Sequence, residues 1–309
     1  MMETAVMDTT NDERMVNDLR RACPRGLRID ESMAKHTTIG AGGHVRFFAA
    51  PTNTREIALL VRAAVKHGVP YIGVGRGSNL LVRDGGYDGL IIKVASNVAD
   101  LKIYKETAYA EAGLSFTKLG KVLTRHGRPG YEFAIGIPGS VGGAVRMNAG
   151  AFGSDLSKVL KSVKMIDEAG RISVLQASEI AFRYRQSSLP RGAIVLSAVF
   201  KCPPGAMDDE RLRRTLSRKE TQPLSDRSFG STFTNPPGGF AAEMIEACGL
   251  KGKRRGGVMI SKKHANFVIN VGENTRANDA EDLIEFVRQE VNKRYGVRLK
   301  PEVIIIGNR

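Results

Sequence analysis

The sequence predicts an α+β fold built from two or three packed units. Strand-like and helix-like segments alternate irregularly along the 309 residues, unlike the regular alternation that builds a wound parallel sheet. The length is sufficient for two or three units with cores of their own. Apolar residues make up 42% of the chain and charged residues 26%, which is the composition of an ordinary globular enzyme.

Two breaks divide the chain into an N-terminal segment and three units. Residues 1–30 mix charged residues with few apolar ones, so a loosely ordered tail without a secretory signal is expected there. A polar break near 96–100 closes a first unit, residues 31–98. Pro203-Pro204-Gly205 closes a second unit, residues 99–204, and leaves 205–309 as the third.

Local signals place elements in the first two units. Asn53 and Glu56 form a capping-box start for a helix that ends at Gly68. A second helix is expected from Ser115 to His126, closed by Gly127. The strands expected in these units are Val45–Ala50, Tyr71–Val74, Leu90–Val94, Leu101–Tyr104, Ala108–Ala112, Val163–Ile166, Ile172–Leu175 and Ile194–Phe200.

The third unit is expected to contain three helices and a closing strand. A basic helix lies near Glu210–Lys219, and a second has Phe240, Met244, Ile245 and Cys248 on one side. The third is predicted from a capping box at Asn278 and Glu281 to Tyr295. The chain closes with an apolar strand, Val297–Ile306, whose residues from Val303 onward should be buried.

Composition excludes several classes of protein. No stretch approaches the roughly 18 apolar residues needed to span a bilayer. The three cysteines lie far apart, and the histidines have no metal-ligand spacing, so neither a disulfide framework nor a metal site is expected. Buried, reduced cysteines indicate a cytoplasmic protein.

The net charge of +15 requires an explanation. Proteins that bind single-stranded nucleic acid without reading its sequence usually add aromatic stacking platforms to their basic residues. The basic clusters here contain no aromatic residue: Arg211, Arg213 and Arg214, then Lys251, Lys253, Arg254 and Arg255. A solvated basic face is favoured, followed by steering of an anionic nucleotide, with RNA binding a distant third.

A glycine-rich turn follows the strand predicted at 71–74. Its glycines, Gly73, Gly75 and Gly77, are spaced G-x-G-x-G and lead into a strand, whereas a Rossmann site needs G-x-G-x-x-G leading into a helix. Closely spaced glycines still allow backbone N–H groups to converge on an anion. A tight hairpin is an equally good interpretation of this turn alone.

A second segment poor in large side chains favours the anion site. Residues 136–153 contain glycine and small residues over a long run, with too little periodicity for a core helix or strand. Such a segment lets the backbone approach another group closely. One cleft for a large phosphate-bearing cofactor would explain both segments.

The motifs in these two segments closely resemble those of the UDP-N-acetylenolpyruvoylglucosamine reductases. The first motifs are Gly75-Arg76-Gly77-Ser78-Asn79-Leu80, Gly136-Ile137-Pro138-Gly139-Ser140-Val141-Gly142-Gly143 and Met147-Asn148-Ala149-Gly150-Ala151. The later ones are Tyr184-Arg185-Gln186-Ser187, Gln222-Pro223-Leu224-Ser225, Gly230-Ser231-Thr232-Phe233-Thr234-Asn235-Pro236 and Pro301–Gly307. They occur in family order between about residues 36 and 307.

The resemblance implies a two-part FAD-binding domain of the vanillyl-alcohol oxidase type, followed by a C-terminal α+β substrate-binding domain. It implies that NADPH reduces the FAD, which then reduces the enolpyruvyl ether of a UDP-sugar in the synthesis of peptidoglycan precursor. The residues implied to bind the cofactor are Gly75, Arg76, Gly77, Ser78, Asn79, Leu80, Ile137, Pro138, Gly139, Ser140, Gly142, Gly143, Asn148, Ala149 and Gly150.

Three residues match catalytic positions of the family. Ser231 is implied to protonate the carbanion that hydride transfer leaves. Arg185 offers a planar, permanently charged fork to a carboxylate or enolate. Glu302 is expected at the edge of a buried strand, where a raised pKa would let its protonated form stabilise the enol. Tyr184 and Asn235 are implied to contact the substrate.

The match also shows departures. Thr234 stands where many members of the family have a basic residue, and the chain resembles the shorter family type, which lacks an extra substrate-covering loop. An alternative is an FAD oxidase of the same fold that acts on a sugar or alcohol. No nucleic acid, membrane or obligate protein partner is expected.

Overall fold

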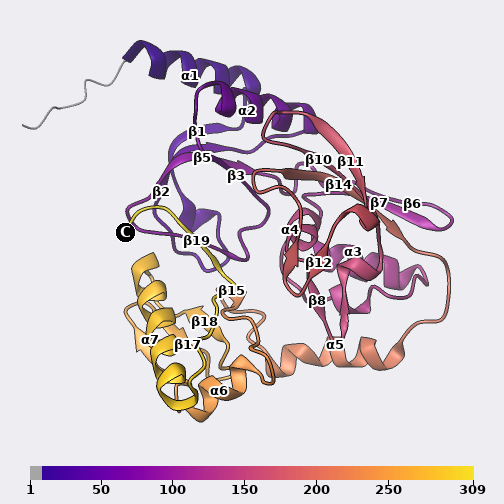
Figure 1. Cartoon of the computed structure of the whole chain (residues 1–309), viewed down its shortest axis with the longest axis vertical. Helices are drawn as coiled ribbons and strands as arrows, with labels where there is room; N and C mark the ends of the chain where they lie inside the picture. Colours follow the sequence, from indigo (N-terminus) through magenta and orange to yellow (C-terminus); the bar gives the residue numbers. More distant parts are fainter. Residues whose placement is uncertain (1–8) are drawn as a thin grey trace, which may run out of the picture.

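The computed structural model describes residues 9–309, with side chains from residue 12 onward. Three larger β-sheets and their helices surround the centre of the molecule (Figure 1). The short elements that connect them are the 3₁₀ turns η1 (Met33–Lys35), η2 (Glu132–Ala134), η3 (Leu156–Lys158) and η4 (Ala177–Glu179), and the strands β8 (Gly150–Ala151), β9 (Ser154–Asp155), β12 (Phe182–Arg183) and β13 (Gln186–Ser187).

The first sheet has the strand order β1-β2-β5-β3. Its strands are β1 (Leu27–Ser32), β2 (His44–Ala49), β5 (Tyr87–Lys93) and β3 (Tyr71–Val74). Helix α2 (Thr54–Lys66) begins as predicted, because the Asn53 side chain accepts a hydrogen bond from the Glu56 amide at 2.9 Å. Its apolar face is buried, so the helix covers this sheet.

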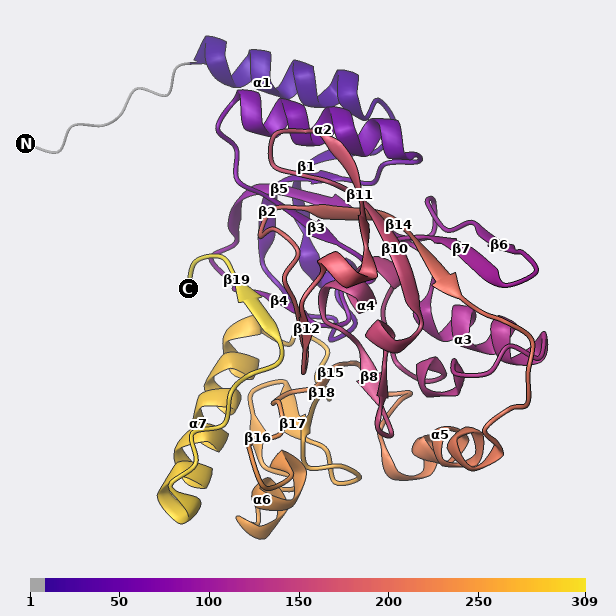
Figure 2. The same cartoon turned by 45° about the vertical axis from the view of Figure 1, so that its right-hand side comes forward.

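The prediction of a loosely ordered tail is wrong for residues 9–30. Helix α1 (Thr9–Ala22) lies beside α2 (Figure 2), and β1 joins the first sheet. The reason is an apolar stripe at helical spacing: Met15 and Leu19 are buried against the same core as α2. Asp18, on α1, also pairs with Lys66 and His67 at the end of α2. Residues 1–8 of the predicted tail lie outside the described residues.

The second sheet is antiparallel throughout, with the order β11-β10-β14-β7-β6. Its strands are β6 (Leu101–Ile103), β7 (Thr107–Glu111), β10 (Leu160–Ile166), β11 (Ile172–Gln176) and β14 (Ile194–Lys201). Helix α3 (Phe116–Arg125) follows β7 and begins one residue after the predicted start, with Ser115 as its N-cap. Part of its surface belongs to the large core shared with the first sheet.

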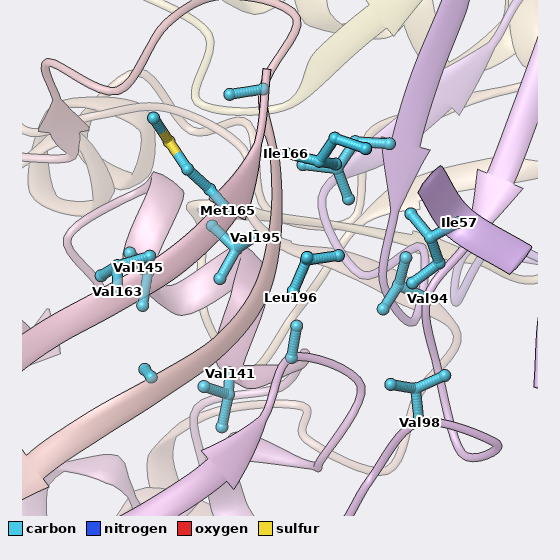
Figure 3. Packing of buried hydrophobic residues seen from close by; sticks show 14 of the residues in the cluster. Ile57, Val94, Val98, Val141, Val145, Val163, Met165, Ile166, Val195 and Leu196 are labelled. Carbon is cyan, nitrogen blue, oxygen red and sulfur yellow. The ribbon is translucent and has the colours of Figure 1, made fainter. Parts of the chain in front are cut away.

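Within 136–153, the prediction of no core element is wrong. Residues Val141–Arg146 form helix α4, whose Val141, Ala144 and Val145 are buried. Figure 3 shows Val141 and Val145 near Val195 of β14. Two adjacent glycines hid the helix in the sequence, but they also allow it to lie close to neighbouring backbone. Gly142 is in such a place, since a Cβ there would lie 3.0 Å from the Ala112 Cβ.

The third sheet has the order β15-β18-β17-β16 and forms a separate core with two helices. The elements of this region are α5 (Asp209–Thr221), β15 (Ser228–Ser231), α6 (Ala241–Ala247), β16 (Arg254–Arg255), β17 (Val258–Ile260), β18 (Phe267–Asn270) and α7 (Ala277–Tyr295). Helix α7 begins one residue before the predicted cap, Asn278. The physical reason is tertiary: the carboxylate of Asp84 accepts hydrogen bonds from the Ala277 and Asn278 amides at 2.9 and 3.0 Å.

The predicted closing strand over 297–306 is too long. Only β19 (Ile304–Ile306) is a strand, and it pairs in parallel with β4 (Leu80–Val82) of the first unit. Val303 is buried, but Ile304 is 46% exposed. Pro301 has no N–H to donate to a ladder and forms an isolated bridge with Phe233. The main chain thus hydrogen-bonds to the third unit up to the Glu302 amide and to the first unit beyond it, while the Val303 side chain still packs in the core of the third unit.

The described residues contain neither a membrane-spanning helix nor a cluster of metal-ligating side chains. No helix within residues 9–309 is long and apolar enough to cross a membrane. The same residues contain no cluster of histidine, cysteine, aspartate or glutamate that could hold a metal ion.

Candidate active site

One cavity of about 270 Å³ lies where the three units meet. The elements that supply its lining, among them β3, β4, α4 and β15, converge near the centre of the molecule (Figure 2). The structure therefore brings the two glycine-rich segments to one cavity. Of the predicted cofactor-binding residues, all except Asn148 line it: Gly75, Arg76, Gly77, Ser78, Asn79, Leu80, Ile137, Pro138, Gly139, Ser140, Gly142, Gly143, Ala149 and Gly150.

The turn between β3 and β4 presents its backbone to this cavity. Within residues 9–309, the amides of Arg76, Gly77 and Ser78 donate to no protein acceptor. Gly77 has φ +69°, and a Cβ there would lie 2.1 Å from the carbonyl oxygen of His36. Glycine is therefore required at this position both for conformation and for space. Consecutive free amides in such a turn form a concave site for an anion.

The second glycine-rich segment packs directly against the first. A Cβ on Gly75 would lie 2.2 Å from the Ser140 Oγ, and a Cβ on Gly139 would lie 3.0 Å from the Ser78 Oγ. Ser140 also caps α4, accepting a hydrogen bond from the Gly143 amide at 3.4 Å. The two segments thus form one backbone-lined wall, which only small residues permit.

Arg185 and Glu302 meet at the cavity. The Arg185 Nε lies 3.0 Å from Glu302 Oε1, and Arg185 Nη1 donates to the Gly150 carbonyl at 2.9 Å. Arg185 lies in the two-residue turn between β12 and β13 with φ +56°, a conformation that non-glycine residues rarely adopt. This backbone geometry and the two contacts fix the guanidinium beside the carboxylate.

The Glu302 carboxyl has a raised pKa. Burial favours its neutral form, while the positive charge and hydrogen bonding of Arg185 act in the opposite direction. Burial is the larger effect, because the side chain is only 15% exposed. Glu302 is therefore more easily protonated than an ordinary glutamate, as expected from the sequence.

Ser231 ends β15 at the same cavity. It is half-buried, pairs with Phe267 of β18 and follows Gly230, which has φ +76°. The neighbouring Thr232 carbonyl accepts a hydrogen bond from the Glu302 amide at 2.8 Å. The serine and the glutamate thus lie on adjacent backbone segments.

The charge of the lining is strongly positive. It contains four arginines (Arg76, Arg146, Arg185 and Arg218) and a single carboxylate, Glu302. An anionic ligand matches this balance.

Models of two protein families match the chain. The FAD binding domain matches residues 45–176, and the C-terminal domain of UDP-N-acetylenolpyruvoylglucosamine reductase matches residues 222–306. A reductase of that name from Anoxybacillus flavithermus is 40% identical over 302 residues, which cover 96% of this chain and all of the relative. One from Streptococcus pyogenes is 43% identical over 286 residues, 91% of this chain and 96% of its own length.

The chain belongs to the UDP-N-acetylenolpyruvoylglucosamine reductase family. The solved reductase from Thermus caldophilus superposes on it with a TM-score of 0.76 and 33% identity, covering 90% of this chain and 99% of that one. The predicted combination of an FAD-binding domain with a C-terminal reductase domain in an α+β fold is confirmed.

The cavity of this reductase fits the FAD that its family implies. The free amides at 76–78 and the side-chain-free wall of Gly75, Gly77 and Gly139 suit a long group that carries phosphates. Neither histidine nor cysteine occurs in the lining.

Asn148 of this reductase lies behind the wall rather than in it. Its side chain is buried, donates to the Arg183 carbonyl at 3.2 Å and accepts from the Ser157 amide at 3.0 Å. These bonds support the hairpin that carries Arg185.

The two predicted substrate residues lie outside the lining. Tyr184 is 57% exposed, and its ring centroid is 5.1 Å from the Arg185 guanidinium carbon. Asn235 is exposed and accepts a hydrogen bond from the Ala241 amide at the start of α6 at 3.1 Å.

Arg218 lines the cavity but was not singled out from the sequence. Two of its nitrogens donate to Gln222 Oε1 at 3.1 and 2.8 Å, while the buried Nη1 has no partner among the described residues. Burial and the nearby charge of Arg185 lower its pKa. The arginine's place four residues before the Gln222-Pro223 motif was the only available signal, and its own helix is mostly solvated.

Proposed function

We propose that this chain is an NADPH-dependent flavoenzyme that reduces the enolpyruvyl group of UDP-N-acetylglucosamine enolpyruvate to give UDP-N-acetylmuramate. The observation that carries the proposal is the convergence of Ser231, Arg185 and Glu302 on the cavity that the two glycine-rich segments line. Family membership supports the same reaction. The product is a precursor of peptidoglycan.

The backbone wall is proposed to hold FAD. The amides at 76–78 would receive its phosphates, and the wall formed by Gly139, Ser140 and α4 would lie along the rest of it. When bound, FAD supplies the hydride that NADPH has delivered to it. Asn148 supports this wall from behind.

Arg185 is proposed to bind and stabilise the negative charge that develops beside the substrate carboxylate. Its guanidinium is already held by Gly150 and Glu302, so little reorganisation is needed when charge develops. Glu302 has a raised pKa. Its protonated form is proposed to donate a hydrogen bond to the oxygen on which this negative charge develops.

Ser231 is proposed to deliver the proton that completes the reduction. A serine hydroxyl is a weak acid, so it must be close to the carbanion and shielded from water. Its position at the end of β15, half-buried in the cavity lining, meets that requirement.

The substrate is proposed to bind over the third unit, residues 205–309, with the FAD in units 31–98 and 99–204. Arg218 would then face an anionic group of the substrate. Tyr184 and Asn235 are exposed, and we propose that the UDP-sugar contacts both when it binds. We place the enzyme in the cytoplasm, with this small molecule as its partner and no nucleic acid, membrane or obligate protein partner.

The test is an anaerobic absorption experiment. The purified protein should show a flavin spectrum that NADPH bleaches and that the enolpyruvyl nucleotide restores. An oxidase would be favoured instead if oxygen reoxidised the flavin, and if the protein oxidised a sugar or alcohol but did not react with the nucleotide. Protein that takes up no flavin would refute both.

A further inference from the structure

Asn79 connects the cofactor turn to Glu302. It is the last residue of the turn, immediately before β4. Its Nδ2 donates to the carbonyl oxygen of Glu302 at 3.0 Å, and its own carbonyl accepts from the Ile304 amide at 3.0 Å. One residue of the first unit therefore makes two hydrogen bonds with the segment that carries the buried carboxyl.

The opposite side of Glu302 is held by the third unit. The Glu302 amide donates to the Thr232 carbonyl at 2.8 Å, next to Ser231. The main chain at Glu302 is thus fixed between Asn79 and Thr232, before β19 pairs with β4. Among the described residues, the Glu302 side chain makes one polar contact, the ion pair with Arg185. The place of the carboxyl accordingly depends on where these two hydrogen bonds hold the backbone.

We propose that Asn79 is a positioning residue that acts through Glu302, in addition to the backbone role of its turn in holding the cofactor. The inference rests on the proposed function. The Asn79 side-chain amide would hold the Glu302 main chain, so that the Glu302 carboxyl keeps its position relative to the flavin and to Ser231. A displacement of about 1 Å in such a group is sufficient to cost about 10²-fold in rate.

The geometry distinguishes Asn79 from its neighbour. Ser78 lines the same cavity, but its hydroxyl faces the second glycine-rich segment, where a Cβ on Gly139 would contact it at 3.0 Å. The matched control is Asn270→Ala. The Asn270 Nδ2 also donates to a main-chain carbonyl of another unit, that of Ile39 at 2.8 Å, but Asn270 does not line the cavity. Asn79→Ala removes the donor, and Asn79→Asp keeps the shape but places an acceptor against the Glu302 carbonyl.

The test measures the two half-reactions of the flavin-loaded enzyme by stopped-flow absorbance. In both Asn79 variants, reduction by NADPH should stay close to the wild-type rate, while reoxidation by the enolpyruvyl nucleotide should slow by about 10- to 100-fold. Asn270→Ala should leave both rates close to those of the wild type. Equal slowing of both steps, or weaker flavin binding alone, would reduce Asn79 to a cofactor contact and overturn the proposal.

A double-mutant cycle provides the second test. If Asn79 acts through the carboxyl, Asn79→Ala should have little further effect on reoxidation once Glu302→Gln is present, because coupled residues are not additive. Full additivity would overturn the proposal. If Asn79→Ala does not fold, the isosteric Asn79→Asp carries the cycle. Failure of the wild-type enzyme to be reoxidised by the nucleotide would instead refute the proposed function itself.

Discussion

The Arg185 guanidinium lies 3.0 Å from the Glu302 carboxylate, although the two residues come from different units of the chain. Burial raises the pKa of Glu302, and the arginine beside it opposes that rise. The pair thus combines a permanent cation with a carboxyl that is readily protonated. In the proposed reaction, these two groups would stabilise the enolate before it is protonated.

Arg185→Lys should lose most of the activity. The guanidinium bonds the Gly150 carbonyl and Glu302 at the same time, and an ammonium cannot reproduce this planar arrangement. Loss of a preorganised donor of this kind costs about 10²–10³ in kcat. Steady-state kinetics at saturating NADPH measure the effect. A wild-type kcat in this variant would remove Arg185 from the reaction.

Ser231→Ala should leave flavin reduction by NADPH almost intact and slow the product-forming step. Loss of a general acid typically costs about 10²–10⁴-fold. Single-turnover absorbance separates the two steps. Ser173→Ala, an exposed serine on β11, is the control and should match wild type in both. Unimpaired product formation in Ser231→Ala would contradict the proton-donor role.

Glu302 should make stability depend on pH in a defined direction. Because its folded-state pKa is raised above the ordinary 4.5, its contribution to stability is complete below that value and is lost as pH rises through the folded-state pKa. Relative to Glu302→Gln, which does not titrate there, wild type should become progressively less stable as the pH rises above about 4.5.

Urea unfolding of both proteins across that range measures the difference in free energy of unfolding. The Gln variant also leaves Arg185 without its ion pair, which adds an offset at all pH values, so the slope is the informative quantity. A difference independent of pH would show that Glu302 titrates normally.

Gly77→Ala should abolish or greatly weaken flavin binding. The new Cβ would lie 2.1 Å from the His36 carbonyl oxygen, in a backbone with φ +69°, so the turn must move. Gly127→Ala is the matched control, since it has φ +64° but no atom within 4 Å. Both variants pay about 1–2 kcal/mol for the left-handed conformation. Only Gly77→Ala should lose flavin binding, which fluorescence titration measures.

Asp18→Asn should lower the melting temperature at neutral pH. Lys66 Nζ and His67 Nε2 lie 2.7 and 2.9 Å from its carboxylate and lower the Asp18 pKa to about 2. A depressed pKa contributes stability above the ordinary 3.8, and this contribution is lost as pH falls toward 2. The gap between the two melting curves should therefore close over that interval. A gap that persists at pH 2 would point to packing rather than charge.

Elements whose ends are encoded locally could be predicted from the sequence. The start of α2 follows from Asn53 and that of α3 from Ser115, because each side chain caps the helix that it precedes. The glycine turn at 75–79 was predicted to be followed by a strand rather than a helix, and β4 is that strand. For such elements the controlling interaction spans only a few residues.

Elements that depend on distant partners could not be predicted. Helix α7 starts where its first amides donate hydrogen bonds to the Asp84 carboxylate. Helix α4 is stabilised by burial against β14 (Figure 3). Helix α1 packs against α2. The position of Arg218 in the cavity lining also results from tertiary packing. The start of α7, the packing of α4 and the position of Arg218 depend on contacts that sequence spacing does not encode. The apolar stripe of α1, with Met15 and Leu19, is present in the sequence, but the core that buries it is not.

The sequence by itself determined the reductase family, because the motifs occur along the chain in the order of the family. It also determined which two segments are poor in large side chains, because the conformational freedom of glycine is a property of the residue itself. Only the tertiary structure decided that Arg185 and Glu302 pair, that Asn79 bonds the Glu302 carbonyl and that Asn148 lies behind the wall. These are distances between segments far apart in the chain, and they exist only once the three units have packed together.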